Sequence, residues 1–274
     1  MSDIFTMDVF AKYYDVNKIA PDNFSKYYLE PHILRKNVEK NIFDRPDVKS
    51  RIDYILKRKN VSQEDDNINR IMLKTLNEVN NDAKDSYKKA VKILAELQYN
   101  KTEHFQKLAE IILEKAITES VFCSLYANIC FEMAKYYITA DDKQIFFRHI
   151  LIKITQTNYE KQLMNCEKSD KMKFVGIVKF ISELYKIGLF PYKIIGGCFT
   201  SLVDNIYKSH NVSECISELI SSSYSNLVKD ALTNTAAKEL LESIKNKLKV
   251  LVEDSKLQIK SKFAIQNALD TFKC

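Results

Sequence analysis

Glycine and proline are scarce in this sequence of 274 residues, which contains only four of each. Architectures rich in β-turns need more of both residues, so a β-sandwich or β-barrel is not expected. Four glycines also leave little scope for a loop that cradles phosphate, and neither G-x-x-x-x-G-K-S/T nor G-x-G-x-x-G is present. No apolar run approaches about 18 residues, and the first residues lack the features of a signal peptide. We therefore expect no membrane span.

The sequence also lacks the residue clusters that catalysis or metal binding requires. It contains neither C-x-x-C nor H-E-x-x-H, and its four histidines are isolated. The paired carboxylates Asp65-Asp66 and Asp141-Asp142 fall where loops or helix starts are expected, and we interpret them as solvated or capping groups. We therefore predict that the protein is not an enzyme and needs no metal or cofactor.

Cysteine usage and charge indicate the compartment and the kind of partner. The six cysteines are scattered, most of them among apolar neighbours, and buried free thiols are the favoured interpretation in a reducing compartment. We therefore expect a cytoplasmic protein. The formal charge of +6 is modest and favours an anionic partner such as RNA.

What the sequence does contain is helical periodicity, most clearly from Thr102 to Ile138. Apolar residues recur there in steps of three and four, which places each set on one side of an α-helix. A short polar segment, Thr118 to Ser120, separates the two sets, so the stretch predicts two helices folded back on each other. The two sets are Phe105, Leu108, Ile112 and Ala116, and then Phe122, Leu125, Ile129 and Met133.

Similar stripes continue to the end of the chain. Asp141 to Gln144 resembles an N-terminal capping sequence, which predicts that a long helix begins there and runs through Phe146 and Ile150. Its partner is expected to end at Gly188. The whole pattern predicts about five antiparallel helix pairs in an all-α solenoid or bundle, the size range of HEAT-type repeats. The other predicted helices lie at 71–79, 85–97, from Pro191, and at 213–232, 236–252 and 256–272.

The first 66 residues follow a weaker pattern of short apolar and aromatic clusters. The polar, acidic stretch from Asn60 to Asn67 marks a boundary. We therefore divide the chain into a short helical N-terminal extension, residues 1–66, and a helical-repeat domain, residues 67–274.

Two phrases in the repeat domain resemble a known family. The run from Leu113 to Cys130, L-E-K-A-I-T-E-S-V-F-C-S-L-Y-A-N-I-C, resembles the second repeat of the middle domain of eukaryotic translation initiation factor 4 gamma. That family carries phrases close to F-E-K-A-I/L-S-E-P-x-F-S-x-x-Y-A-x-x-C, and this chain departs from it at Ser120-Val121, where the family has proline. Gly176 to Lys186, G-I-V-K-F-I-S-E-L-Y-K, resembles the family's G-N-I-K-F-I-G-E-L-F-K. The shared residues of the first phrase are Glu114, Lys115, Ala116, Glu119, Phe122, Ser124, Tyr126, Ala127 and Cys130.

The resemblance implies a crescent of five HEAT repeats that binds a DEAD-box RNA helicase of the factor 4A type. Such a translation initiation scaffold favours the closed helicase, while ATP hydrolysis belongs to the helicase itself. By the same resemblance, Leu73 and Leu76 take the positions of a leucine pair that contacts the helicase, and Tyr87 takes the position of a nearby aromatic residue. Their spacing alone favours core leucines, and only the resemblance makes the contact interpretation equally good, so both stay open.

Two further contacts are predicted. Lys179 and Lys186 lie seven residues apart on one side of a helix, and Lys171 and Lys173 precede them, so this lysine face could hold RNA phosphates. Ordinary solvated lysines are the alternative, and no interleaved aromatic ladder indicates base stacking. In the extension, the resemblance implies a short helix that binds a cap-binding protein, against the alternative of an ordinary amphipathic helix packed on the domain. Its residues are Tyr28, Ile33 and Leu34.

Two other functions compete with the helicase scaffold. One is an RNA-binding adaptor without a helicase partner. The other is a related middle-domain scaffold of mRNA decay, splicing or cap-binding complexes. Leu73, Leu76 and Tyr87 distinguish the helicase scaffold from both, and the lysine face distinguishes the RNA adaptor.

Overall fold

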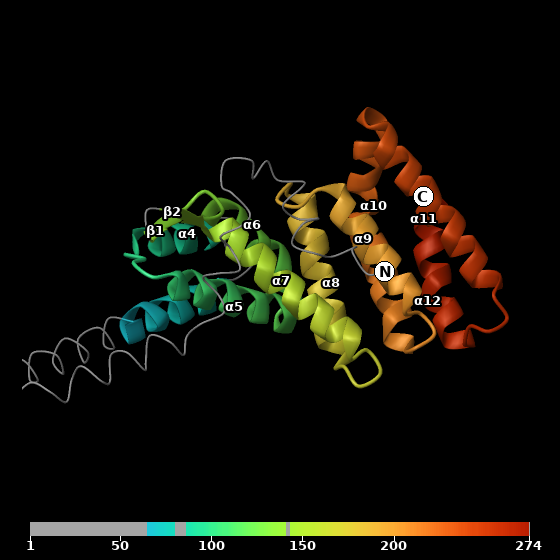
Figure 1. Cartoon of the computed structure of the whole chain (residues 1–274), viewed down its shortest axis with the longest axis horizontal. Coiled ribbons are helices and arrows are strands. Elements are labelled where there is room, and N and C mark those ends of the chain that lie inside the picture. The colour runs from blue at the N-terminus through green and yellow to red at the C-terminus, as the bar shows by residue number, and fades with distance from the viewer. Residues whose placement is uncertain (1–64, 80–85, 141–142, 274) are drawn as a thin grey trace, which may run out of the picture.

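The computed structural model describes residues 65–79, 86–140 and 143–273. Within these residues, helices follow one another in five consecutive pairs along the long axis of the molecule, from left to right in Figure 1. The all-α helical-repeat prediction is confirmed. The pairs are 65–77 with α4 (Ser86–Glu96), α5 (Thr102–Thr118) with α6 (Cys123–Met133), α7 (Phe147–Met164) with α8 (Lys171–Lys186), α9 (Tyr192–Asp204) with α10 (His210–Thr233), and α11 (Thr235–Glu253) with α12 (Ile259–Asp270).

The second helices of successive pairs form a continuous packed row. Helix α4 packs on α6, α6 on α8, α8 on α10, and α10 on α12. The helix α5 packs on both α7 and α8, which joins the second pair to the third. One hydrophobic core therefore runs through the described chain, from Met72 to Ala268.

Helix α8 illustrates how the sequence sets these elements. Asp170 caps its first turn, because its side chain accepts a hydrogen bond of 2.9 Å from the Met172 amide. Its predicted end is confirmed at Gly188, whose φ of +79° favours glycine. The amide of Leu189 then donates to the Leu184 carbonyl over 3.0 Å, as in a Schellman motif. Local sequence therefore fixes both ends of α8.

A second glycine on α8 allows close helix packing. A Cβ atom at Gly176 would lie 3.1 Å from the Cα and carbonyl oxygen of Ile117 on α5. Both of those atoms belong to the backbone, so a larger side chain would push the two helices apart. The glycine that opens the second family-like phrase therefore sets the distance between α5 and α8.

One predicted helix start is wrong. In place of a helix beginning at Asp141, the chain forms an antiparallel pair of strands, β1 (Tyr137–Ala140) and β2 (Lys143–Phe146), and α7 begins only at Phe147. Along β1, the buried Ile138 lies between the exposed Tyr137 and Thr139. This alternation has the period of a strand, and it outweighs the capping signal.

Several predictions concern the N-terminal extension. Residues 1–64 lie outside the described residues, and so does the predicted cap-binding segment with Tyr28, Ile33 and Leu34. The predicted burial of the cysteines is confirmed for the five that the structure describes. No helix among the described residues has both the length and the apolar character to cross a membrane.

Candidate functional site

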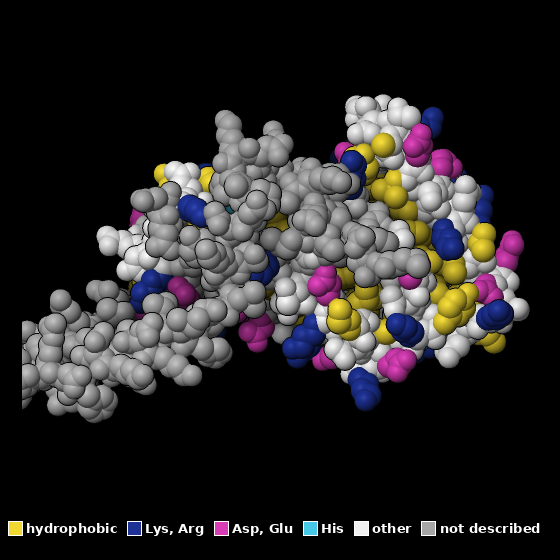
Figure 2. Space-filling view, viewed as in Figure 1, with side chains coloured by type: hydrophobic (Ala, Val, Ile, Leu, Met, Phe, Trp, Pro, Cys, Tyr) yellow, Lys and Arg dark blue, Asp and Glu magenta, His cyan; other side chains and the backbone are white. Residues whose placement is uncertain are grey.

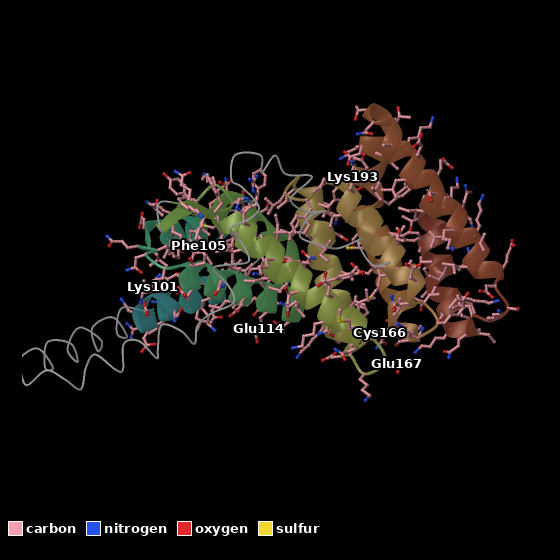
Figure 3. All side chains as sticks on the ribbon, in the orientation of Figure 1. Lys101, Phe105, Glu114, Cys166, Glu167 and Lys193 are labelled. Carbon is pink, nitrogen blue, oxygen red and sulfur yellow. The ribbon has the colours of Figure 1, made fainter. Side chains whose placement is uncertain are left out.

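The turn between α5 and α6 contains much of the first family-like phrase, and three of its polar side chains form one network. Lys115 forms an ion pair of 2.8 Å with Glu119, and the fully buried Tyr126 donates a hydrogen bond to the same carboxylate. The Tyr126 hydroxyl also lies 3.4 Å from the Leu76 carbonyl. The Tyr126 hydroxyl therefore links α6 to the Glu119 carboxylate at the end of α5 and to the first described helix. By contrast, Glu114 of the same phrase is exposed on α5 (Figure 3).

This network shifts the pKa values of its members. Burial, followed by the hydrogen bond to Glu119, raises the pKa of Tyr126 far above its usual range. Partial burial acts to raise the pKa of Glu119, but the hydrogen bonds from Lys115 and Tyr126 outweigh it, so the pKa is lower than usual. At neutral pH the charged carboxylate therefore accepts from both groups, and the network stabilises the junction.

The structure separates the two leucines that the sequence paired. Leu73 is 43% exposed on the first described helix, whereas Leu76 is 0% exposed and belongs to the core. Tyr87 is half-buried against the core from α4. Of these three residues, Leu73 presents the most surface to a partner, and Leu76 supports its helix from beneath. For Leu76 the structure therefore agrees with the core interpretation.

The four lysines of the predicted RNA face are not equivalent. Lys173 is exposed and Lys179 is half-buried, while Lys186 forms an ion pair of 2.7 Å with Glu183. Lys171 forms an ion pair of 2.5 Å with Glu214 on α10. Figure 2 likewise shows cationic and acidic side chains interspersed over the C-terminal helices. Among the described residues, Lys173 and Lys179 form no ion pair, and the face as a whole carries mixed charge.

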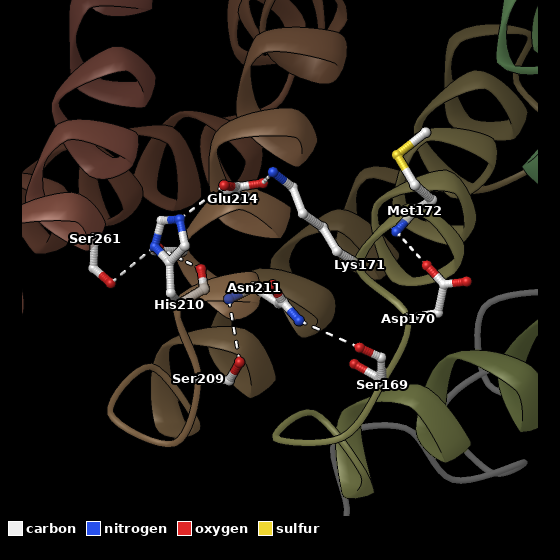
Figure 4. A network of polar contacts seen from close by, with 10 residues as sticks. Ser169, Asp170, Lys171, Met172, Ser209, His210, Asn211, Glu214 and Ser261 are labelled. Carbon is white, nitrogen blue, oxygen red and sulfur yellow. Dashed lines mark hydrogen bonds and ion pairs between the residues drawn. The ribbon is translucent and has the colours of Figure 1, made fainter.

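Lys171 belongs to a network that joins three helix pairs (Figure 4). Glu214 accepts from Lys171 and also lies 2.8 Å from the Nε2 atom of His210. The other ring nitrogen of His210 lies 3.2 Å from the Ser261 hydroxyl on α12. Burial acts to raise the pKa of Glu214, but Lys171 and His210 outweigh it and lower the pKa overall. Lys171 therefore has a structural partner that competes with any RNA phosphate.

Sequence reasoning missed an aromatic surface on the strand pair. Tyr137 pairs with Phe146 across the two strands, with ring centroids 5.4 Å apart, and Phe146 meets His149 at 5.7 Å. The signal was present as two four-residue runs, Y-I-T-A and K-Q-I-F, separated by two residues, which is the spacing of a β-hairpin. The two residues between the runs are Asp141 and Asp142, without the glycine that two-residue hairpin turns favour, so the sequence resembled a helix cap instead.

Comparison with known proteins identifies the class of this helical-repeat protein. The model of the MIF4G domain family matches residues 55–274, which include every described helix. The chain therefore belongs to the MIF4G domain family.

Within that class, the chain is similar to translation initiation factors. It is 26% identical over 217 residues to "Eukaryotic translation initiation factor 4 gamma" of Dictyostelium discoideum, which covers 59% of this chain and 15% of that protein. It is 22% identical over 220 residues to "Eukaryotic translation initiation factor 4 gamma 3" of Homo sapiens, which covers 69% of this chain and 13% of that protein. The chain thus spans only a small part of the length of these relatives.

Proposed function

We propose that this protein is a translation initiation scaffold that binds a DEAD-box RNA helicase of the factor 4A type and also binds RNA. The observation that carries the proposal is the match of the MIF4G domain family over residues 55–274. The names of the similar proteins, which are initiation factors 4 gamma, support the process. The scaffold itself is not an enzyme, and hydrolysis of ATP belongs to the helicase.

The helicase contact centres on Leu73. This side chain is 43% exposed, while Met72 and Leu76 on the same helix are fully buried and hold the helix on the core. A scaffold that binds the closed helicase more tightly than the open one raises the population of the closed form. Tyr87 on α4 contributes its accessible part to the same contact. The cap-binding segment at Tyr28, Ile33 and Leu34 remains part of the proposal as a second protein contact.

The test compares two exposed leucines. Leu73→Ala should weaken helicase binding by about 1–4 kcal/mol, the range of apolar hot spots. Leu232→Ala, at a residue that is 80% exposed near the end of α10, is the matched control and should bind normally. Binding is measured by titration with purified helicase, and its RNA-dependent ATPase rate is recorded alongside.

Three outcomes are informative. Loss of binding and of ATPase stimulation in Leu73→Ala alone supports the proposal. If both variants bind the helicase equally well, Leu73 is not part of the contact. If the unmodified protein neither binds nor stimulates the helicase, the helicase function is wrong, and the RNA adaptor becomes the better interpretation.

The RNA contact on α8 is tested through salt dependence. Lys173 is exposed and forms no ion pair with any described residue, so Lys173→Ala should weaken RNA binding and reduce the slope of log K against log salt by roughly 0.7–0.9. Lys171→Ala should affect RNA binding less, because Glu214 already neutralises that ammonium group. The reverse order would contradict this assignment.

A further inference from the structure

The pair of strands between α6 and α7 has two chemically different faces. Ile138 is buried and Ile145 packs against the core, so this face anchors the strands to the domain. On the opposite face, Tyr137 pairs with Phe146, and the next outward pair is Thr139 with Gln144. Tyr137, Thr139 and Gln144 are all exposed. An aromatic pair and a polar pair therefore share one accessible sheet face.

The aromatic rings continue from the strands onto α7. The Tyr137 and Phe146 rings are tilted by 50°, and the Phe146 and His149 rings meet edge to face at 76°. Burial, and then the nearby Arg148, lower the pKa of His149. At neutral pH its imidazole is therefore an uncharged ring. The result is a short aromatic ladder from Tyr137 through Phe146 to His149.

Phe147, which directly follows β2, attaches the strand pair to the hydrophobic core. The Phe147 amide donates to the Tyr136 carbonyl over 3.0 Å, directly beyond the last strand pair. The Phe147 ring is fully buried and meets Phe105 of α5 at 5.6 Å. Tyr137 nevertheless keeps 49% of its surface exposed. Tyr137 therefore presents part of its ring to solvent from a well-supported strand.

The segment that carries the ladder contains more cations than acids. Lys135 precedes Tyr137 and its side chain is 65% exposed, and Arg148 and Lys153 follow on α7, whereas Lys143 alternates with the outward Gln144 on β2 and so belongs to the opposite face. Glu132 accepts from Lys135 at 3.3 Å, and the acidic pair 141–142 connects the strands in sequence. From Glu132 to Lys153 the four cations and three acids leave a net charge of +1. The net charge of this segment therefore slightly favours an anionic ligand.

We propose that the outward face of this hairpin binds single-stranded RNA by stacking bases on the Tyr137–Phe146–His149 ladder. Aromatic platforms flanked by Lys and Arg bind unpaired nucleotides with little sequence preference, since every base has a π-face. Thr139 and Gln144 supply hydrogen-bonding groups beside the rings. The inference rests on the RNA-binding part of the proposed function and deepens it, because it assigns the bases to the hairpin and leaves phosphate contacts to α8.

The first experiment measures the fluorescence anisotropy of a labelled single-stranded oligouridine with the full chain. Tyr137→Ala should weaken binding by at least about fivefold, the lower end for loss of one stacked base. Tyr137→Phe keeps the ring and should restore binding. Phe263→Ala is the matched control, because Phe263 is 68% exposed on α12 at the far end of the chain. Melting curves verify that every variant is folded.

The second experiment separates stacking from attraction to phosphate. An oligonucleotide of the same length with abasic sugars keeps the phosphates and removes the bases. The unmodified protein should bind it at least about fivefold more weakly than oligouridine. Tyr137→Ala should bind both oligonucleotides with similar affinity.

Each outcome decides between explanations. Weaker binding in Tyr137→Ala alone, with rescue by Phe, supports the inference. Normal RNA binding by Tyr137→Ala overturns it and leaves RNA binding elsewhere, and reduced helicase binding by the same variant would make the hairpin a protein contact instead. If the unmodified protein binds no RNA, both the hairpin site and the RNA part of the proposed function are wrong, while the helicase titration tests the remaining part independently.

Discussion

The two connections on either side of α6 use tyrosine in opposite ways. At the first connection, Tyr126 in the first turn of α6 is fully buried, and its hydroxyl donates to Glu119 at the end of α5. After α6, Tyr137 is 49% exposed on a hairpin that carries the aromatic ladder outward. The buried connection belongs to the phrase that resembles the family, and the exposed one lies outside it. The family-like residues at this turn therefore maintain the fold, while accessible binding chemistry lies beside them.

The largest expected effect is a loss of stability when the buried tyrosine, rather than the exposed one, is replaced by alanine. Tyr126→Ala removes a fully buried ring and leaves Glu119 without one donor, so unfolding should be easier by about 3–5 kcal/mol. Tyr137→Ala removes one exposed cross-strand pair and should cost about 0.2–1 kcal/mol. Urea denaturation gives both values. Similar losses for the two variants would contradict the contrast between the connections.

A milder change at Tyr126 isolates its hydroxyl. Tyr126→Phe keeps the ring and removes the hydrogen bond to the charged carboxylate, so we expect a loss of about 1.5–3 kcal/mol. The same denaturation experiment measures it. An unchanged free energy of unfolding would indicate that Glu119 gains an equivalent donor from water.

Acid should weaken the buried connection in a specific way. The pKa of Glu119 lies below its usual value of 4.5 in the folded protein, so its stabilisation is complete above about pH 4.5 and is lost as the pH falls through the folded pKa. Glu119→Gln should therefore reduce the loss of stability between about pH 6 and pH 3. Other carboxylates with lowered pKa values, such as Glu214, remain as a common background. Identical pH profiles would show that Glu119 is not coupled to folding.

The smallest effect is expected on the surface of α8. Lys186 is paired with Glu183 three residues earlier, and both side chains are partly accessible. Lys186→Ala should change the free energy of unfolding by less than about 0.5 kcal/mol. A thermal melt verifies this value, and a large decrease in melting temperature would show that the pair is structural.

Much of the architecture could be predicted from the sequence because helix periodicity and helix ends are local signals. The spacing from Phe105 to Ala116 and the stop at Gly188 each depend on neighbouring residues, and the structure confirms both. The hairpin was missed because two nearby signals compete at Asp141 to Gln144. A capping sequence favours a helix there, whereas the flanking runs Y-I-T-A and K-Q-I-F, two residues apart, favour a β-hairpin.

The candidate contact residues were harder to predict because exposure depends on packing between distant segments. Leu73 and Leu76 are three residues apart, yet only the packing of their helix places one outside and the other in the core. Lys171 and Lys173 both appeared solvated, but Glu214, more than forty residues away, pairs with Lys171. Periodicity shows that residues share a face, whereas partners from other helices decide what that face can bind.

The most direct test measures stability and RNA affinity on the same two variants, Tyr126→Phe and Tyr137→Ala. If the buried connection maintains the fold and the exposed one binds bases, Tyr126→Phe should lose stability and keep its affinity for oligouridine under folding conditions. Tyr137→Ala should show the reverse, with a nearly normal free energy of unfolding and at least about fivefold weaker binding. Loss of RNA affinity in folded Tyr126→Phe, together with normal affinity in Tyr137→Ala, would contradict the division between a structural and a ligand-binding connection.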